Sequence, residues 1–471
     1  MGVKVIFSLD SEDYETPASD DAEKWWAETI ISCGATASTC VVGELARALR
    51  ERGRRDVLEA MSRLEVCYHS DMHSFHPTHA EYLDEMGWDD GVAEVIARES
   101  KGVADVAYIL GQWPAAYCKP GNSWGPQVPR AMAAMGIPVF TDAPFEFCTG
   151  RPMWYDNTLF IRYHMALDAY FGEPHTDRLR LLQTEFLRRC QEHQEVLINQ
   201  QGLIESQNFL EGGYLVVFTH PCRLVTASFP GNFNHGNNPD RSQWRPAPLR
   251  PAEEVASLKE DLEQFIRWVA SLGDVEICSY KELYNRHRMA PSPWLGVEEL
   301  KRICIELPEK PTYVRANAEW LTPAELFSAV VRAALWFIER GRVPECVPVQ
   351  RLYGPSENPP LVNAEGTAGG DAMETAVREA DGYCVEHGSL PASIRVGGSD
   401  VGPNSFMRAC IDLLNGRKPI IRRMPEMPAL AERPDIAVKS MRGTWVVFPP
   451  EFEGRRVLEL ARLHTWAAKP A

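Results

Sequence analysis

The sequence predicts an α/β fold, a distorted (β/α) barrel of seven or eight strands, with a smaller C-terminal α+β domain. From residue 1 to about 285, short apolar and β-branched runs alternate with stretches whose apolar residues recur every three or four positions. Several of the short runs also end in polar residues that can do chemistry, as strands do at the functional face of a barrel. The length of 471 residues accommodates one large barrel and a second domain.

Seven short apolar runs are predicted to be strands: 3–9, 37–42, 64–68, 115–118, 137–141, 214–219 and 275–279. The amphipathic stretches between them are predicted to be helices: 20–32, 43–62, 91–110, 126–135, 176–200 and 252–272. The last of these carries Leu258, Leu262 and Phe265 on one face. Alternation of this kind, repeated seven or eight times, is typical of a barrel.

A proline-rich stretch at 291–318 predicts a boundary near 300, with the barrel at 1–290 and an α+β accessory domain at 300–471. In that domain, Thr322-Pro323 followed by Glu325 predicts the start of a helix. The stretches 321–344 and 401–419 share an order of small residue, proline, phenylalanine, apolar helix, Gly-Arg and proline. Duplication and chance both explain this likeness at the level of sequence. Segment 354–370 is expected to be a surface loop.

The charge balance disfavours nucleic acid and anionic membranes as partners. Lys and Arg number 49 against 65 Asp and Glu, which leaves a formal net charge of −16. The N-terminus lacks the layout of a signal peptide, and no apolar run reaches the roughly 18 residues of a membrane span. The twelve cysteines include no C-x-x-C pair. We therefore expect reduced thiols and a cytoplasmic location, and homo-oligomerisation remains open.

The polar residues at the strand ends form the candidate site. They are Asp10, Glu12 and Asp13 after the first predicted strand, His69 after the third, Lys119 after the fourth, Asp142 after the fifth and His220 after the sixth. In a barrel, loops at the C-terminal ends of the strands gather such residues into one pocket. The alternative is that these residues have no catalytic role. The carboxylates would then be solvated loop residues, and His220 would be a buried, hydrogen-bonded histidine.

The motif His69-Ser70-Asp71-Met72-His73 is the sharpest local signal. Two imidazoles four residues apart can face the same way on one helical turn and share a metal ion. A third protein ligand from elsewhere would leave positions for water and substrate, as in catalytic zinc sites. Exposed or merely hydrogen-bonded histidines are the alternative, and the nearby His76 and His79 add to it.

The order and spacing of these motifs resemble the polysaccharide deacetylase superfamily (NodB homology, carbohydrate esterase family 4) over residues 1–285. HSDMH matches the family's H-[ST]-x-x-H metal motif at every defined position. Weaker matches are FSLDSEDYE to the first motif, GATASTCVVGE to the following segment, CKPGNSW to the third motif, FTDAP to the fourth and FTHP to the fifth. The resemblance implies a distorted barrel with one divalent metal ion, for which Zn²⁺ is expected and Co²⁺ is the alternative.

The resemblance also implies roles for individual residues. Asp10 corresponds to the general base, His220 to the general acid, and Glu12, His69 and His73 to the metal ligands. Because Glu12 stands where the family usually has Asp, Asp13 is an alternative ligand.

Three further assignments are less specific. Asp142 is a candidate for orienting His220. Lys119 stands where the family has an arginine that pairs with the base, and it offers a point charge in place of a planar fork. Trp124 and Asn122 are candidates for contact with a saccharide.

The activity that the resemblance implies is metal-dependent removal of an N-acyl group, typically acetyl, from an amino sugar of a saccharide. Two alternatives stay open: an amidohydrolase acting on a small cyclic amide or ureide, as in the allantoinase-like branch, and a catalytically silent barrel that binds carbohydrate. The loop 228–245, which contains His235, is either a substrate lid or a plain surface loop. Nothing in the sequence assigns a role to the accessory domain.

Overall fold

The computed structural model describes residues 2–143, 151–201, 213–230, 238–288, 294–317, 319–363, 365–434, 448–449 and 451–471. The chain divides into two compact units. Unit 1 comprises Met1–Pro152, Phe160–His287 and Ile436–Gly454, and unit 2 comprises Met153–Leu159, Arg288–Asp435 and Arg455–Ala471. The units therefore differ from the expected continuous domains 1–290 and 300–471, because each draws on more than one stretch of the chain.

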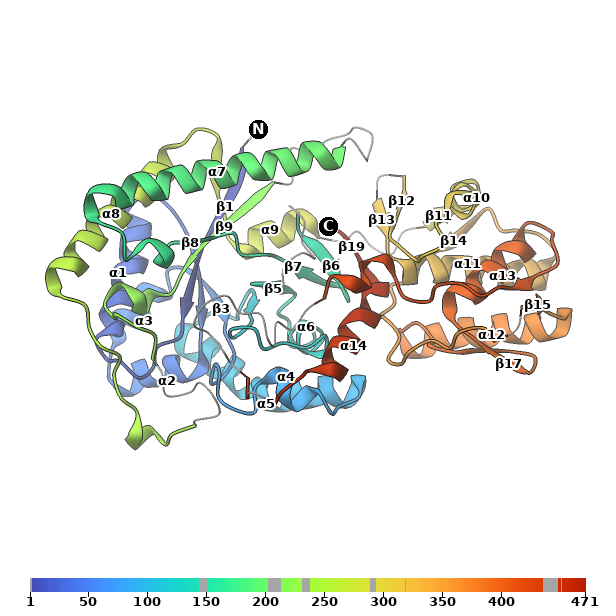
Figure 1. Ribbon diagram of the computed structural model, residues 1–471, viewed down its shortest axis with the longest axis horizontal. Coiled ribbons are helices and arrows are strands. Elements are labelled where there is room, and N and C mark those ends of the chain that lie inside the picture. Colours follow the sequence, from blue (N-terminus) through green and yellow to red (C-terminus); the bar gives the residue numbers. More distant parts are fainter. Residues whose placement is uncertain are drawn as a thin grey trace. The chain divides into compact units, whose positions relative to one another are not determined.

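Unit 1 is built on a parallel sheet that curls into a half-barrel, which confirms the expected distorted α/β fold (Figure 1). Its strands are β1 (Val3–Ser11), β2 (Ser38–Val41), β3 (Glu65–Tyr68), β4 (Tyr117–Cys118), β5 (Val139–Thr141), β8 (Met165–Ala166), β9 (Tyr214–Thr219) and β10 (Val275–Ile277). The order across the sheet is β5-β4-β3-β2-β1-β9-β8, and β10 also pairs with β1. All seven strands expected from the sequence are present, and β8 is an addition.

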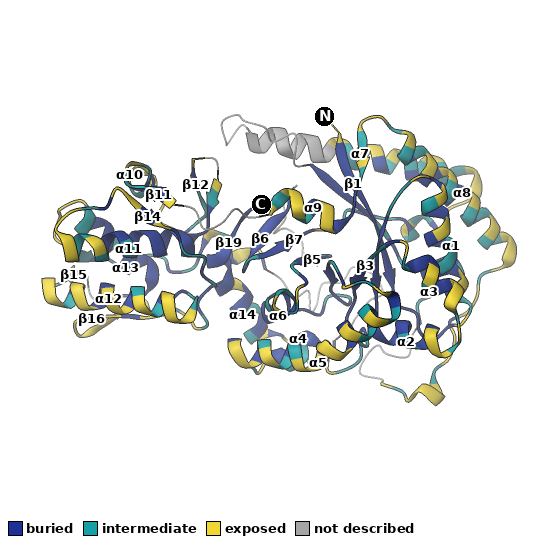
Figure 2. Cartoon of the chain, turned by 180° about the vertical axis from the view of Figure 1, so that it is seen from behind, coloured by how far each residue is buried: buried dark blue, intermediate teal, exposed yellow. Residues whose placement is uncertain are grey.

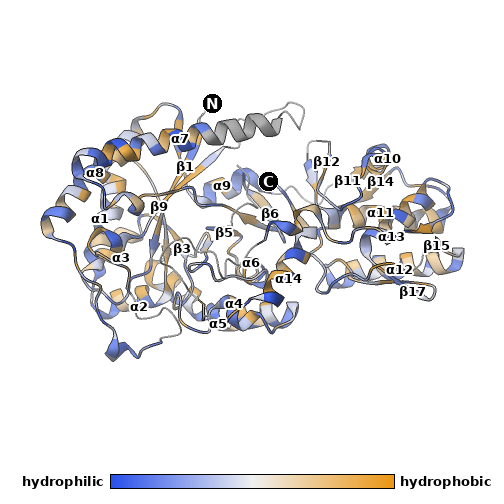
Figure 3. Cartoon of the chain, viewed as in Figure 1, coloured by the Kyte–Doolittle hydropathy of each residue, from blue (hydrophilic) through white to orange (hydrophobic). Residues whose placement is uncertain are grey.

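The helices of unit 1 follow the sheet in α/β order: α1 (Ser19–Ser32), α2 (Gly43–Glu51), α3 (Arg55–Met61), α4 (His79–Leu83), α5 (Trp88–Leu110), α6 (Gln127–Ala134), α7 (His175–Gln201), α8 (Ala252–Ser271) and α9 (Tyr280–His287). The helix predicted over 43–62 is two helices, because Gly53 adopts a left-handed φ of 73° between them. Figure 3 shows hydrophobic and hydrophilic residues mixed around helices such as α5 and α8, as expected for helices with one buried face.

Strand β1 is buried along its whole length and separates two environments (Figure 2). Val5, Phe7 and Leu9 join the hydrophobic core that also contains Trp26 of α1 and Phe265 of α8. Because side chains alternate along a strand, the intervening residues, including Asp10, belong to the opposite face of the sheet. This alternation places the start of the candidate site inside the curl of the sheet.

Unit 2 repeats one succession of elements. The first copy is β11 (Trp294–Gly296), α10 (Val297–Glu306), β12 (Val314–Ala316), β13 (Glu319–Leu321), α11 (Pro323–Arg340) and β14 (Cys346–Pro348). The second is β15 (Gly366–Thr367), α12 (Gly370–His387), β16 (Ile394–Val396), β17 (Ser399–Val401), α13 (Pro403–Leu414) and β18 (Ile420–Ile421). In both copies the outer strands pair antiparallel and the inner strands form a hairpin. The shared topology favours duplication as the source of the sequence likeness.

The remaining elements complete the two units. They are β6 (Met153–Tyr155), β7 (Thr158–Phe160), α14 (Arg455–Leu463) and β19 (Ala468–Pro470), and β19 pairs antiparallel with β6. Helix α11 begins as predicted, with a capping box between Thr322 and Glu325. The expected loop 354–370 contains the short strand β15. Within the described part of the chain, no helix combines the length and apolar composition needed to cross a bilayer.

Candidate metal centre

Glu12, His69 and His73 converge on one point beyond the C-terminal ends of β1 and β3. The Nε2 atom of His73 lies 2.8 Å from Oε2 of Glu12, and Nε2 of His69 lies 3.5 Å from the same oxygen. One ligand atom from each residue lies within 4.8 Å of the other two, and all three residues are buried. The structure therefore brings together the three residues that the motifs single out as metal ligands.

The two histidines do not lie on a helical turn, so this part of the prediction is wrong. Residues 69–78 contain no helix, and Ser70 and His73 adopt left-handed φ values of 65° and 53°. The carbonyl groups of Ser70 and Asp71 accept hydrogen bonds from the backbone N–H groups of Gly43 and Glu44, at 3.0 and 2.9 Å. These bonds hold the loop in a conformation that turns both imidazoles toward Glu12.

Each imidazole is oriented through its second nitrogen. Nδ1 of His69 lies 3.0 Å from the carbonyl oxygen of Cys118, and Nδ1 of His73 lies 2.8 Å from the hydroxyl of Ser74. Because a carbonyl can only accept, His69 carries its proton on Nδ1 when neutral, which leaves the Nε2 lone pair for a cation. This arrangement of a ligand nitrogen and a hydrogen-bonded partner nitrogen is the usual one in metal sites.

The residues present fit a divalent cation. The second carboxylate oxygen of Glu12, Oε1, is buried and has no hydrogen-bond partner among the described residues. Burial alone would favour the neutral acid, but the charges of His73 and His220 hold the pKa of Glu12 well below its ordinary value. Two imidazole nitrogens and one carboxylate form a donor set that suits Zn²⁺ and leaves coordination positions open.

Asp13 does not compete with Glu12 as a ligand. Its Oδ1 accepts hydrogen bonds from the backbone N–H groups of Glu15 and Thr16, at 3.1 and 2.9 Å, and its Oδ2 accepts one from the hydroxyl of Ser19 at 2.6 Å. Both carboxylate oxygens are thus used to shape the turn that leads into α1. In this geometry Asp13 has a structural role, and Glu12 is the candidate third ligand.

Asp10 lies beside the cluster and is held by a tyrosine. The hydroxyl of Tyr163 donates to Oδ1 of Asp10 at 2.7 Å, and the hydroxyl of Ser8 lies 2.9 Å from that of Tyr163. Burial raises the pKa of Asp10 to about 7. The sequence motifs did not identify Tyr163, which lies between β7 and β8, as a partner of the base.

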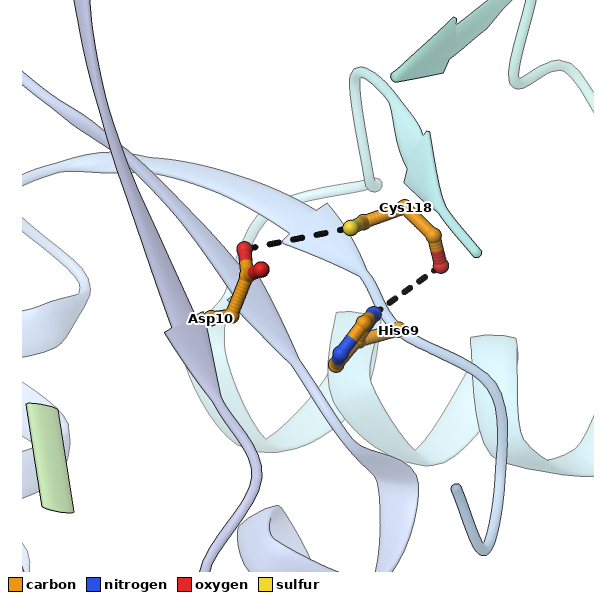
Figure 4. Close-up of side chains that lie close together, drawn as sticks. All are labelled: Asp10, His69 and Cys118. Carbon is orange, nitrogen blue, oxygen red and sulfur yellow. Dashed lines mark hydrogen bonds between the residues drawn. The ribbon is translucent and has the colours of Figure 1, made fainter. Parts of the chain in front are cut away.

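A second group of potential ligands shares His69 with the first. Asp10, His69 and Cys118 also place one ligand atom each within 4.8 Å of the others, and Figure 4 shows the Cys118 sulfur directed at the Asp10 carboxylate. The Sγ atom lies 3.8 Å from Oδ1 of Asp10 and 3.2 Å from the Tyr163 hydroxyl. Burial raises the pKa of Cys118 well above its ordinary value. Because the thiolate is the form that binds metal, Glu12, His69 and His73 are the better set.

His220 is oriented by Asp168 and not, as expected, by Asp142. Nδ1 of His220 lies 2.9 Å from Oδ2 of Asp168, and its Nε2 lies 3.9 Å from Oδ2 of Asp10. Burial opposes the charged imidazole, but Asp168 and the other nearby carboxylates outweigh it and raise the pKa of His220 to about 10. The ring of Phe229 packs edge-on against His220, with ring centroids 4.8 Å apart.

Lys119 and Asp142 bond to each other. The Nζ atom of Lys119 donates to Oδ2 of Asp142 and to the carbonyl oxygen of Gly121, both at 2.5 Å. The contacts that the structure describes for Asp10 come from Tyr163, Cys118 and His220. The expectation that Lys119 pairs with the base is therefore corrected, because its ammonium group is engaged within its own loop and with Asp142.

The two residues predicted to contact a saccharide differ in exposure. Trp124 is 1% exposed and packs against Phe140 and Phe160, with ring centroids 6.2 and 6.4 Å away, so it is a core residue and not a stacking surface. Asn122 is partly exposed, and its side-chain oxygen lies 3.4 Å from Nζ of Lys119. In the loop 228–245, residues 231–237, with His235, lie outside the described residues.

Comparison with known proteins gives structural likenesses only. No family model and no curated protein matches the chain. It is similar to a probable polysaccharide deacetylase from Pseudomonas aeruginosa PAO1, with 14% identity, coverage of 61% of this chain and 93% of that chain, and a TM-score of 0.40.

Two further solved structures belong in the same comparison. A family 4 carbohydrate esterase from Streptomyces lividans in complex with acetate has 12% identity, coverage of 59% of this chain and 91% of that chain, and a TM-score of 0.30. Puue allantoinase has 14% identity, coverage of 61% and 92%, and a TM-score of 0.39. Identities and TM-scores this low do not carry an activity over to this chain.

Proposed function

We propose that the chain is a metal-dependent hydrolase that removes an N-acyl group, typically acetyl, from an amino sugar of a saccharide. The observation that carries the proposal is the convergence of Glu12, His69 and His73, with the Asp10 carboxylate beside them and His220 within 3.9 Å of Asp10. These are the parts that amide hydrolysis requires: a cation site, a base and an acid.

A divalent cation bound by these three residues would supply Lewis-acid polarisation of the acyl oxygen and would lower the pKa of a water molecule. Both effects are needed because an amide is a poor electrophile and water is a poor nucleophile. The empty hydrogen-bonding capacity of Glu12 Oε1 supports a cation at this place.

Asp10 and His220 carry the proton transfers in this proposal. The Asp10 carboxylate, held by the Tyr163 hydroxyl, accepts the proton of the attacking water. Nε2 of His220 gives a proton to the leaving nitrogen as the carbon–nitrogen bond breaks, so that the products are a carboxylic acid and a free amine. Asp168 stabilises the charged imidazole and keeps Nε2 turned toward Asp10.

The complete set of groups argues against a catalytically silent barrel. A silent barrel would retain the fold without needing an acid, a base and three convergent ligands. A small cyclic amide or ureide could be cleaved by the same groups, so the choice of substrate rests on tests with saccharides and cyclic amides side by side.

The test is acetate release together with metal content. Purified full-length protein is loaded with Zn²⁺ or Co²⁺ and incubated with oligomers of N-acetylglucosamine, and in parallel with a cyclic ureide. We expect about one equivalent of metal and release of acetate from the oligomers. Absence of bound metal together with absence of acetate release would refute the proposal, and hydrolysis of the ureide alone would select the alternative substrate class.

A further inference from the structure

The loop of residues 69–78, which carries both candidate histidine ligands, contains a strained backbone. Ser70 and His73 adopt left-handed φ values of 65° and 53°, a conformation that residues with a Cβ atom rarely adopt. Such strain persists only where surrounding contacts hold the backbone in place. Asp71 and Met72 stand at the two undefined positions of the H-[ST]-x-x-H motif, so the motif assigns them no role. Their contacts show what holds the loop.

The side chain of Asp71 is held by Arg47 of α2. Nη1 of Arg47 donates to Oδ1 of Asp71 at 2.6 Å, and Nη2 lies 3.7 Å from Sδ of Met72. The guanidinium group is itself fixed, because its Nε donates to Glu44 at 2.8 Å and its Nη1 also donates to Asp105 at 3.0 Å. The Arg47 side chain is only 11% exposed, so water and salt screen these ion pairs little.

The backbone of Asp71 is held from two sides as well. Its N–H group donates to Oε2 of Glu99 on α5 at 3.0 Å. Its carbonyl oxygen accepts from the backbone N–H of Glu44 on α2 at 2.9 Å. Through its side chain and its backbone, this one residue joins the loop to both helices.

Two glycines provide the space that the Asp71 side chain occupies. Gly43 is the first residue of α2, and Gly102 lies within α5. A Cβ atom at either position would come within 3.0 Å of Oδ1 of Asp71, closer than real Cβ atoms approach. Glycine inside a helix is less favourable than alanine, and the close approach of Asp71 accounts for Gly102 at its position. Both helices are therefore shaped to accept this carboxylate.

Asp71 acts on the metal centre through the backbone and not as a ligand. Its Oδ1 is bonded to Arg47, and the two groups of potential metal ligands among the described residues do not include it. It lies two residues from each of the flanking histidines His69 and His73, so a shift of Asp71 moves both imidazoles. Metal–ligand distances tolerate changes of only about 0.2 Å, so even a small shift weakens binding.

We propose that Arg47, acting through Asp71, is a positioning residue that holds His69 and His73 where they meet Glu12. We call this contact the Arg47–Asp71 clamp. Without the clamp, the loop would relax toward conformations without left-handed residues, in which the two imidazoles no longer converge. A loop held in advance loses less conformational entropy when the cation binds. The inference rests on the proposed function for the presence of the cation.

The test measures Zn²⁺ affinity of full-length protein by competition with a chelator. We expect the dissociation constant to rise about tenfold in Asp71→Ala and about 10- to 100-fold in Arg47→Ala, as for the loss of other outer contacts of metal sites. Asp71→Ala leaves Arg47 paired with Glu44 and Asp105, so it keeps the test valid if Arg47→Ala does not fold. The double variant should bind no more weakly than Arg47→Ala, because both changes remove the same contact. Additive losses would overturn the role of Asp71.

The matched control is Arg178→Ala. Arg178 is another buried arginine of unit 1, and its Nη1 donates to Oδ2 of Asp261 at 2.6 Å, which joins α7 to α8. Its loss should lower the stability of the fold and leave the Zn²⁺ affinity of the folded protein unchanged. Affinity within about twofold of the unmodified chain in both clamp variants, or an equal loss of affinity in Arg178→Ala, overturns the clamp.

Hydrogen exchange of the metal-free proteins separates this inference from the proposed function. The backbone N–H groups of Gly43, Glu44 and Asp71 form the bonds that hold the loop, so peptides containing them should exchange faster in both clamp variants and at the normal rate in Arg178→Ala. If the unmodified chain binds no Zn²⁺, the hydrolase proposal fails. The exchange rates then decide alone: faster exchange in the clamp variants supports the clamp, and unchanged exchange overturns it.

Discussion

Glu12 of unit 1 and Glu325 of unit 2 are both buried carboxylates, but their surroundings differ. In unit 2, both oxygens of Glu325 accept hydrogen bonds from Nζ of Lys469, at 2.9 and 2.8 Å, and Oε2 also accepts one from the backbone N–H of Thr322 at 2.8 Å. In unit 1, Glu12 directs one oxygen at two imidazoles and leaves the other without a partner among the described residues.

Glu325 stabilises the fold, whereas Glu12 keeps one carboxylate oxygen for a ligand. The hydrogen bonds of Glu325 join the start of α11 to β19, so this carboxylate stabilises the fold of unit 2. Glu426 is similar, because it accepts hydrogen bonds from the backbone N–H and the hydroxyl of Ser405 at the start of α13. Substitution of Glu12 should therefore affect the chemistry, and substitution of Glu325 should affect the stability of the fold.

The largest effect is expected at the base. Asp10→Asn keeps the size of the side chain and the contact with Tyr163 but removes the proton acceptor, so turnover should fall about 10³-fold while metal content stays at the level of the unmodified protein. Acetate release and mass-spectrometric metal analysis check both parts. Loss of the metal from this variant would show that Asp10 is a ligand, and the roles of Asp10 and Glu12 would have to be exchanged.

The corresponding change in unit 2 should leave the chemistry intact. Glu325→Gln leaves the ammonium group of Lys469 buried without its counter-charge, which should lower the free energy of unfolding by about 3 kcal/mol. Acetate release per folded molecule should not change. Glu298→Gln is the control, because the Glu298–Lys301 pair is exposed and contributes less than about 1 kcal/mol. Equal destabilisation by the two variants in a urea titration would contradict the comparison.

Asp168→Asn should reduce kcat about 10- to 100-fold. The amide can still accept a hydrogen bond from Nδ1 of His220, but it no longer stabilises the charged imidazole that donates the proton. KM and metal content should stay the same, because Asp168 contacts neither the cation site nor the acyl group in this proposal. Loss of the metal from this variant would place Asp168 in the cation site instead.

Tyr163→Phe should have the smallest effect, a loss of about tenfold in kcat. The hydroxyl positions Asp10 and is not itself a reacting group, so its removal leaves a base that is present but less well oriented. The expected pattern is a change in kcat with unchanged KM, metal content and unfolding temperature, and Tyr108→Phe is the control. A drop in unfolding temperature large enough to account for the lost activity would make the role of Tyr163 merely structural.

The strand-end rule recovered most of the site from the sequence. Asp10, His69 and His220 come together because parallel strands β1, β3 and β9 end at the same edge of the curled sheet. The rule uses only the position of a residue after a strand, so it works without knowledge of the local backbone conformation of the motif. This explains why His69 and His73 were identified on the assumption of a helical turn, although they lie in a loop with left-handed residues.

The sequence did not predict the partners of the base and of the acid, which are Tyr163 for Asp10 and Asp168 for His220. Tyr163 and Asp168 flank β8, which has only two residues and therefore shows no alternation to detect. If β8 is recognised as a strand, the same strand-end rule selects Asp168, which comes two residues after it. His220 bonds to Asp168, and Asp142 bonds to Lys119 instead. Which carboxylate meets His220 depends on contacts between loops that are far apart in the sequence.

The most direct test of the account is the metal content of four proteins after loading with Zn²⁺ and gel filtration. The unmodified chain should retain about one equivalent, Glu12→Gln and His69→Ala should retain almost none, and Cys118→Ser should retain as much as the unmodified chain. Retention by Glu12→Gln together with loss by Cys118→Ser would place the cation among Asp10, His69 and Cys118. That result would contradict the assignment of Glu12, His69 and His73 as the metal centre.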